Sequence, residues 1–412
     1  MVATPVSAAA EVDALVEAAR QLRVEFSETA AEVDEQGVMP LANLQRIHEL
    51  GFNRFLVPRE YGGIVEVERL NWKVTALNEI LTEISAGESS TAQVWMVHTG
   101  VVRKFFANMT DLPRKTLEQI ASEVINEGAR FISSAAEPHK KRLSFKTSGR
   151  RVPGGLIVNG TKYFGTGSTG ARYANVPLLL DGYESVEEGG LYFAIVPLDA
   201  PGVVLHHDWD NMGQRATISQ TITYEDVFVP DGWHYGLAGG AAAFYAPDVI
   251  VGPVAQMSIS AVILGMGLGA FDAVTDYVRR FTRPADPRME DATEDPIIRW
   301  QVGKHSAQLA GARALQREYA AALEAYRGDP ISRGQLSIQM MRSKAMILDA
   351  VLETTGNFHR LAGGRATANK YRFDRFWRNA RTLSVHDGID QKLQSIGTYE
   401  LTGKTPPVTW LT

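Results

Sequence analysis

Leu156-Ile157-Val158-Asn159-Gly160-Thr161-Lys162-Tyr163-Phe164 interrupts a chain whose pattern is otherwise mostly helical. Apolar-rich runs flank an Asn-Gly pair, which suits the two central residues of a type I′ turn, so the stretch predicts a β-hairpin. More strand-like runs follow with no helix between them, at Val176–Leu180, Leu191–Val196, Val203–Leu205 and Thr221–Val229. Short strands in this arrangement favour an antiparallel barrel or sandwich.

Helical patterns lie on both sides of these strands. Before them, residues 8–36, 40–51, 66–85 and 89–107 have helical apolar spacing. After them, long helical runs are expected near 247–283, 295–327, 332–362 and 371–386, and four helices with short links favour a bundle. Because strands and helices are segregated, we predict an α+β chain with an N-terminal helical domain (1–128), a central β-barrel domain (129–236) and a C-terminal four-helix bundle (237–412).

Composition narrows the classes of function. The chain has 412 residues, a net charge of −5 and no cysteine. The length indicates two or three domains, the charge argues against a nucleic-acid partner, and the missing cysteine excludes disulfides and thiolate chemistry. The start, Met1 to Pro5, has no secretory pattern, so we expect a cytoplasmic protein.

One apolar run, Ala255 to Val274, is nearly long enough to span a membrane. It contains polar residues and three glycines, at 265, 267 and 269, which favour a buried helix of a bundle with close backbone approach. We therefore predict no membrane partner.

Several short motifs are rejected. Gly165 to Gly170 matches G-x-G-x-x-G, but a strand rather than a helix follows it, which disfavours a dinucleotide site. The histidines lack metal-ligand spacing, so no metal is expected, and G-x-S-x-G is absent.

The run Phe373 to Gly388 predicts a helix that ends at a His386-Asp387-Gly388 turn. An imidazole beside a carboxylate can exchange protons near neutral pH. The alternative is a histidine that interacts with the helix dipole, and the residues alone leave both open.

Several motifs in the same order resemble the acyl-CoA dehydrogenase superfamily over about residues 40–400. They are Leu50-Gly51-Phe52, Val57 to Gly63, Ala136-Glu137-Pro138, Asn159 to Lys162, Asn211-Met212-Gly213-Gln214-Arg215, Tyr224 to Pro230, Gly363-Gly364 and the His-Asp-Gly turn. In the dehydrogenases a glutamate precedes the final glycine, whereas Asp387 stands here beside His386. The run ending in this turn looks like the branch that contains dibenzothiophene monooxygenases, indole oxygenases and amine N-hydroxylases.

The resemblance implies a two-component monooxygenase. A separate NAD(P)H flavin reductase would supply reduced FMN or FAD, and O₂ would react through a C4a-hydroperoxyflavin. The product would be a hydroxylated electron-rich aromatic, a heteroaromatic of the indole or thiophene type, or an amine. The resemblance also implies a homotetramer, with a dimer as the alternative.

The resemblance assigns roles residue by residue. The catalytic residues would be His386, His98 and Asp387. The cofactor would contact Ser133, Ser134, Phe164, Thr166, Trp209, Arg283, Gly363, Gly364 and Arg365, with Arg283 reaching it from a neighbouring subunit. Trp95, Met96, Phe131, Phe164 and Val385 would line an apolar substrate pocket.

Each assignment has a structural alternative. His98 lies in an apolar helical run and is typical of a core histidine, Trp209 could pack the barrel, and Arg283 could be a charge at a helix end. Arg215 is expected to tie strands together, and Lys140-Lys141-Arg142 to be a solvated loop. Two other readings of the whole chain stay open: an acyl-CoA dehydrogenase with Asp387 as base, and a flavin-free helical scaffold.

Overall fold

A computed structural model describes residues 7–137, 145–237, 246, 248–284, 286 and 288–408. Its first part is helical, as predicted. The helices are α1 (Ala8–Ser27), α2 (Ala30–Gln36), α3 (Leu41–Glu49), α4 (Val74–Gly87), α5 (Ser89–Phe105) and α6 (Arg114–Asn126). Residues 66–73, expected to begin a helix, instead precede α4, because Lys73 has a left-handed backbone (φ 51°) at its N-cap.

The middle of the chain forms one sheet. Its strands are β1 (Phe131–Ser133), β2 (Ser148–Val152), β3 (Gly155–Gly165), β4 (Tyr173–Leu180), β5 (Leu191–Pro197), β6 (Val203–Leu205), β7 (Gln220–Pro230) and β8 (His234–Tyr235). The order is β6-β7-β3-β2-β4-β5-β8, and β1 pairs with β4. Most pairs are antiparallel, but β1 and β2 both run parallel to β4. In the described residues the hydrogen-bonded order runs from β6 to β8 without pairing these two end strands, and the β domain that the sequence predicts is this single sheet.

The predicted hairpin turn at Asn159-Gly160 is wrong, because both residues lie within β3. The chain instead reverses before β3, in the turn between β2 and β3, where Gly154 has φ +82°. At Asn159 the register with β7 shifts, and the Asn159 side chain accepts from the Asp226 backbone N–H at 2.8 Å and donates to its carboxylate at 2.9 Å. Asn-Gly therefore serves as a β-bulge rather than a turn.

The last part is helical again. It contains α7 (Val251–Phe281), α8 (Pro296–Ala325), α9 (Pro330–Gly356), α10 (Phe358–Ala362), α11 (Asp374–Ser384) and α12 (Ile389–Thr402). The expected fourth long helix is the short α11, since the chain turns at residues 385–388 and continues as α12. Where the structure describes this part of the chain, the bundle has three long helices, with α11 packed on α7 and α9 and with α12 packed on α9.

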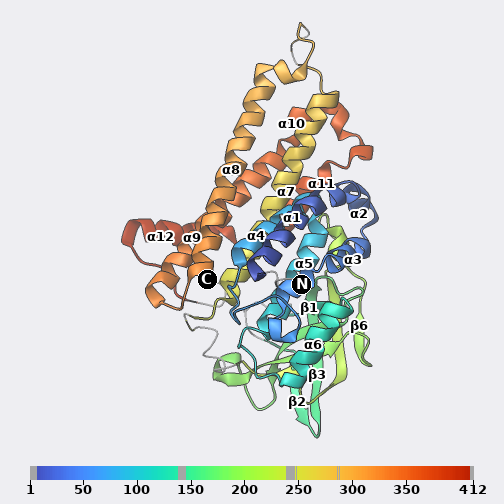
Figure 1. Cartoon of the computed structure of the whole chain (residues 1–412), viewed down its shortest axis with the longest axis vertical. Helices are drawn as coiled ribbons and strands as arrows, with labels where there is room; N and C mark the ends of the chain where they lie inside the picture. The colour runs from blue at the N-terminus through green and yellow to red at the C-terminus, as the bar shows by residue number, and fades with distance from the viewer. Residues whose placement is uncertain are drawn as a thin grey trace, which may run out of the picture.

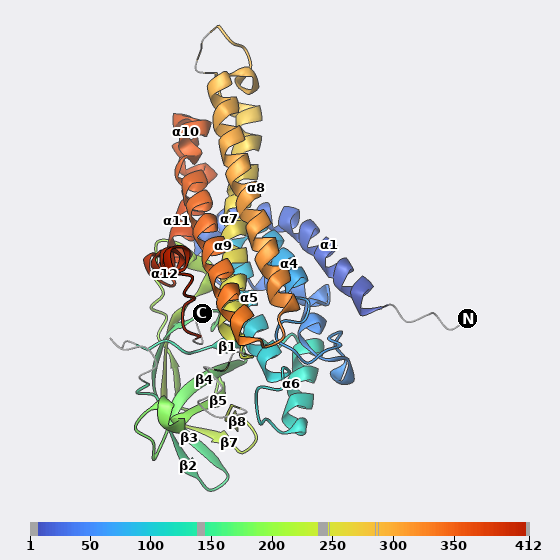
Figure 2. The same ribbon diagram turned by 90° about the vertical axis from the view of Figure 1, so that its left-hand side faces the viewer.

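Helix α7 is the central helix of the molecule. It is long and apolar enough to cross a membrane. However, 83% of its apolar 18-residue stretch is buried inside the protein, as predicted. A Cβ at Gly265 would lie 2.4 Å from the Thr82 carbonyl oxygen, and one at Gly269 would lie 2.3 Å from that of Ala86. Both glycines let α4 approach α7 closely. Figures 1 and 2 show the sheet at one end of the molecule and α10, with the end of α7, towards the other.

Candidate active site

Gln214 joins the sheet to two helical parts of the chain. It lies in the connection between β6 and β7 and is 1% exposed. Its side-chain oxygen accepts from Ser89 Oγ at 2.7 Å, and its Nε2 donates to Gln93 Oε1 at 2.6 Å, so it binds the start of α5. Its backbone N–H donates to Asn379 Oδ1 of α11 at 2.7 Å. The Asn-Met-Gly-Gln-Arg motif is thus the point where all three parts of the chain meet.

Helix α11 adds further bonds at this junction. Arg378 donates to the Met212 carbonyl at 2.7 Å and pairs with Asp34 of α2 at 2.6 Å. A Cβ at Gly213 would lie 2.1 Å from the Arg378 carbonyl oxygen, so glycine is required for this approach. Arg215, expected to tie strands together, instead packs beside Gly37 at the end of α2.

Phe164, Thr166, Trp209 and Ser219 lie next to this junction, where β3 ends, and are called the sheet edge below. The backbone of this region is conformationally strained. Phe164, Gln214 and Ile218 have positive φ values of 58°, 51° and 42°. Bulky residues rarely adopt this conformation, and such strain is found most often at functional sites. The Phe164 ring is 61% exposed and lies edge-to-face against Trp209, with 6.2 Å between ring centroids.

Polar groups lie next to these two rings. Trp209 Nε1 donates to the Gln214 carbonyl at 3.1 Å, which fixes the indole. Thr166 shares a 2.8 Å hydrogen bond with Ser219, and Ser219 shares another with Thr217. Ser134 is less available for a ligand, since it is fully buried and accepts from the Tyr224 hydroxyl at 2.9 Å. Ser133 is half-buried in β1 and paired with β4.

Asp387 is held between two lysines. Lys344 of α9 and Lys392 of α12 both contact its carboxylate, and Lys344 also donates to Gln256 Oε1 of α7 at 2.7 Å. Burial alone would raise the pKa of Asp387, but His386 and the two lysines hold that pKa well below its usual range. Asp387 is therefore an ionised structural partner, and it is unsuited to act as a base near neutral pH.

His386 and Val385 lie at the exposed end of α11. The His386 side chain is 53% exposed, and its Nδ1 lies 3.9 Å from Asp387 Oδ1, which is within ion-pair range but too long for a hydrogen bond. Val385 is 67% exposed. The arrangement leaves the imidazole free to meet a ligand.

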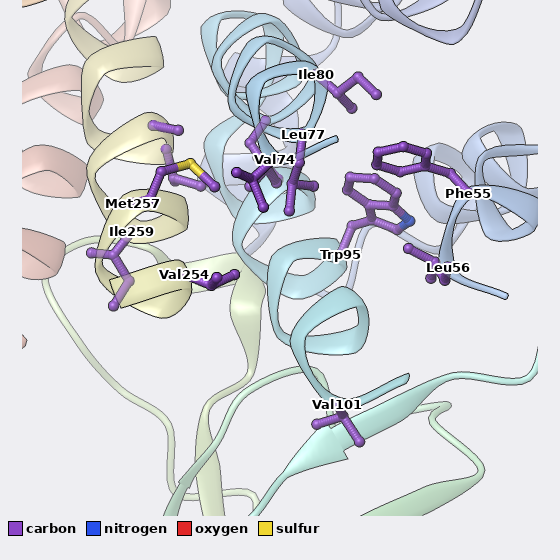
Figure 3. Packing of buried hydrophobic residues seen from close by; sticks show 14 of the residues in the cluster. Phe55, Leu56, Val74, Leu77, Ile80, Trp95, Val101, Val254, Met257 and Ile259 are labelled. Carbon is purple, nitrogen blue, oxygen red and sulfur yellow. The ribbon is translucent and has the colours of Figure 1, made fainter. Parts of the chain in front are cut away.

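His98, Trp95 and Phe131 are core residues in this structure. His98 is 1% exposed, and its Nδ1 accepts the Phe131 backbone N–H at 3.1 Å. Burial lowers its pKa to about 3, so the ring is neutral. Trp95 points toward Phe55 and Leu56 in Figure 3, away from α7, and Phe131 is fully buried. Trp95 and Phe131, expected to line the substrate pocket, both lie in the core between α5 and its neighbours.

One face of α5 is open to solvent, although most residues of this helix are buried. Gly100 is exposed, and a Cβ there would have nothing within 4 Å. Met96, one turn earlier, is half-buried. The open face therefore begins at Met96, three residues after Gln93, which binds Gln214.

The remaining predicted contacts lie together at the far end of the bundle. Arg283 follows α7, and Thr282 contacts the Ala362 carbonyl just before Gly363 and Gly364. Arg283 and Arg365 are exposed, and the Arg365 guanidinium lies over the Phe281 ring. Figures 1 and 2 place this end away from the sheet. Within one chain, these residues are not brought to Phe164 and Thr166.

Sequence reasoning missed the buried partners of the motifs. Ser89, Gln93 and Asn379 hold Gln214, and Lys344 and Lys392 hold Asp387. The one available clue is a lysine at an apolar helical position, Lys344. Lys140-Lys141-Arg142 lies outside the described residues.

The residues at the sheet edge fit a flat aromatic cofactor. Phe164 offers an exposed ring beside Trp209, and the buried hydroxyl groups of Thr166 and Ser219 are hydrogen-bonded to each other at the same edge. For a metal ion, no group of three suitable ligands occurs within the described part of the chain. An organic ring system is therefore the kind of ligand that these side chains could contact.

Comparisons with known proteins agree with this fold. Residues 9–123 match the family "Acyl-CoA dehydrogenase, N-terminal domain", and residues 257–391 match "Acyl-CoA dehydrogenase, C-terminal domain". Dibenzothiophene monooxygenase of Rhodococcus qingshengii is 30% identical, over 95% of this chain and 94% of that protein. A probable FMNH2-dependent monooxygenase, SfnC of Pseudomonas putida, is 28% identical over 94% of this chain and 95% of its own.

A solved structure gives the same result. The complex of TdsC from Paenibacillus sp. A11-2 with FMN and indole has a TM-score of 0.85 and 27% identity, covering 97% of this chain and 99% of that one. The reading as a non-enzymatic scaffold is therefore wrong. The chain belongs to the flavin-dependent monooxygenases of the acyl-CoA dehydrogenase superfamily.

Proposed function

We propose that this protein is the oxygenase of a two-component system in the cytoplasm. It takes reduced flavin, with FMN as the first candidate, from a separate NAD(P)H-dependent reductase. It then transfers one oxygen atom of O₂ to a small electron-rich substrate. Indole- or thiophene-like heteroaromatics are the first substrate class, and amines are the second. The observation that carries this proposal is the strained, exposed Phe164–Trp209 edge beside the Gln214 junction.

Residues at the sheet edge would hold the flavin ring. Phe164 and Trp209 would pack on it, and the Thr166 hydroxyl would hydrogen-bond its polar edge. Bound reduced flavin supplies the electrons that activate O₂. Arg283, Gly363, Gly364 and Arg365 would bind the phosphate end, and because they lie at the far end of α7 they would serve a neighbouring subunit's flavin. We therefore expect a tetramer, with a dimer as the alternative.

His386 would donate a proton to the substrate or accept one from it. Its imidazole is half-exposed at the end of α11, whereas His98 is enclosed in the core. Ionised Asp387 lies 3.9 Å away, is fixed by the two lysines, and would hold a positive imidazole in place. Of the two histidines, His386 is thus the proton donor or acceptor that we propose. Val385 and Met96 would add apolar contacts with the substrate.

The experiment is a coupled reaction with FMN, a reductase and indole. We expect His386→Gln to lower indole oxygenation about 100-fold, the range of general acid–base catalysis, and to release hydrogen peroxide instead. His206→Gln, which changes an exposed histidine bonded to Thr223, is the matched control and should keep wild-type coupling. If wild-type protein only releases peroxide with every heteroaromatic and amine offered, the proposal fails.

A dehydrogenase acting through Asp387 gains no support from the site. The Asp387 carboxylate forms ion pairs with Lys344 and Lys392. We expect acyl-CoA thioesters to leave the spectrum of the flavin-loaded protein unchanged, and bleaching by such a thioester would reverse this view.

A further inference from the structure

Lys104 is a buried cation with an unusual environment. It lies in the last turn of α5 and is 9% exposed. Its Nζ lies 4.2 Å from the centroid of the Phe193 ring and 5.4 Å from that of Tyr235. These rings, from β5 and β8, are stacked at 5.0 Å. Ring faces attract a cation, but they carry no full charge to neutralise it.

The ammonium group of Lys104 has no hydrogen-bond or ion-pair partner in the described residues. Residues 238–245, which follow β8 in sequence, include no Asp or Glu. Burial lowers the pKa of Lys104 to about 7. Buried charges in proteins are normally paired, so this one requires an explanation.

The other two buried lysines of the described chain provide a comparison. Lys162 is paired with Glu137 at 2.6 Å, and Lys344 is paired with Asp387. Each therefore has a carboxylate partner within the protein. Lys104 is the exception, which is the pattern expected when the partner is a ligand.

Its position on α5 points to the same site. Met96, Gly100 and Lys104 are four residues apart, so they lie on one face of the helix. This is the open face at Gly100, where a Cβ would meet nothing within 4 Å. An apolar molecule lying along this face would place one end next to the Lys104 ammonium.

We propose that Lys104 recognises an anionic group of the substrate, so that the natural substrate is a small organic acid with an apolar ring. This inference rests on the proposed monooxygenase function for the location of the substrate. The carboxylate would supply the missing counter-charge, and the ring would lie along Met96 and Gly100 toward the flavin.

The test is calorimetric binding without turnover, with indole-2-carboxylate and indole-2-carboxamide as matched probes. We expect wild-type protein to bind the carboxylate at least tenfold more tightly than the amide. Lys104→Met should abolish this preference, and Lys104→Arg should keep part of it. Lys115→Met, which removes an exposed lysine of α6, is the control and should bind as wild type does.

Stability gives an independent measurement. Removing an unpaired buried charge should leave the melting temperature of Lys104→Met equal to or above that of the wild type. Equal binding of the two probes by wild-type protein, or a preference that survives in Lys104→Met, would overturn the inference. So would a marked loss of stability in Lys104→Met, because it would identify Lys104 as a structural residue. Failure of the proposed function would show separately, as indole oxidation that never occurs while probe binding is normal.

Discussion

At the scale of single residues, Asp387 depends on charges from other parts of the chain. Lys344 and Lys392 reach it from α9 and α12. They keep its pKa well below the usual range despite burial. A depressed carboxylate pKa stabilises the folded state at pH values above the unfolded pKa, and this contribution is lost as the pH falls toward the folded pKa.

Asp387→Asn should therefore destabilise the protein by about 3 kcal/mol at pH 7, since two cations lose their partner and one of them is fully buried. The difference from wild type should narrow as the pH drops below about 4, where the unfolded carboxylate becomes protonated. Urea unfolding at pH 7 and pH 3 measures both values. A difference that stays constant with pH would contradict the charge argument.

Residue roles were only partly accessible from sequence. The adjacency of His386 and Asp387 is visible in the chain, and the exposed imidazole agrees with a role in chemistry. The two lysines that bind Asp387 could not be inferred, because Lys344 is 43 residues away and its side chain meets Asp387 only in the folded bundle. His98 could not be placed either, since the hydrogen bond that its ring accepts comes from a backbone N–H of β1.

At the scale of elements, α7 and α4 are in contact through glycines. Gly269→Ala would place a Cβ 2.3 Å from the Ala86 carbonyl oxygen, and the helices must separate to admit it. We expect a loss of about 2 kcal/mol in the free energy of unfolding, as for other overpacked cores. Gly303→Ala in α8 is the control, because its Cβ meets nothing within 4 Å and alanine favours helices by about 1 kcal/mol. Thermal unfolding that ranks the two variants in the opposite order would be inconsistent with this packing.

Elements with strong periodicity were predictable, and the sheet geometry was not. The apolar runs located β4, β5, β6 and β7 to within a few residues. Asn159-Gly160 led to a wrong turn prediction because the Asn159 side chain bonds to Asp226 of β7, which is 67 residues away in the sequence. Local turn propensity cannot detect such a partner.

At the scale of the whole molecule, Gln214 connects the sheet, α5 and α11 through buried hydrogen bonds. Gln214→Ala removes the side-chain bonds and leaves buried Ser89 and half-buried Gln93 unsatisfied, so we expect a loss of about 2 kcal/mol. Because Trp209 is fixed on the Gln214 carbonyl beside Phe164, FMN affinity should fall as well. Chemical unfolding and flavin fluorescence titration measure the two effects, with exposed Gln391→Ala as the control. Unchanged flavin affinity in a destabilised variant would restrict Gln214 to a structural role.

The order of helical, β and helical parts followed from sequence, because each part has its own apolar period. The junction that fixes the parts against one another did not, since it depends on contacts such as Gln214 to Asn379, 165 residues apart.

The separation of the Phe164 edge from Arg283 and Arg365 has a kinetic consequence. Helix α7 alone has 31 residues, a length of about 46 Å, and Arg283 lies beyond its end. If ring and phosphate ends of one flavin are gripped by different copies, turnover per chain should fall steeply on dilution to nanomolar concentrations. Added excess FMN would then restore only part of it, whereas a crowding agent that promotes self-association would restore more.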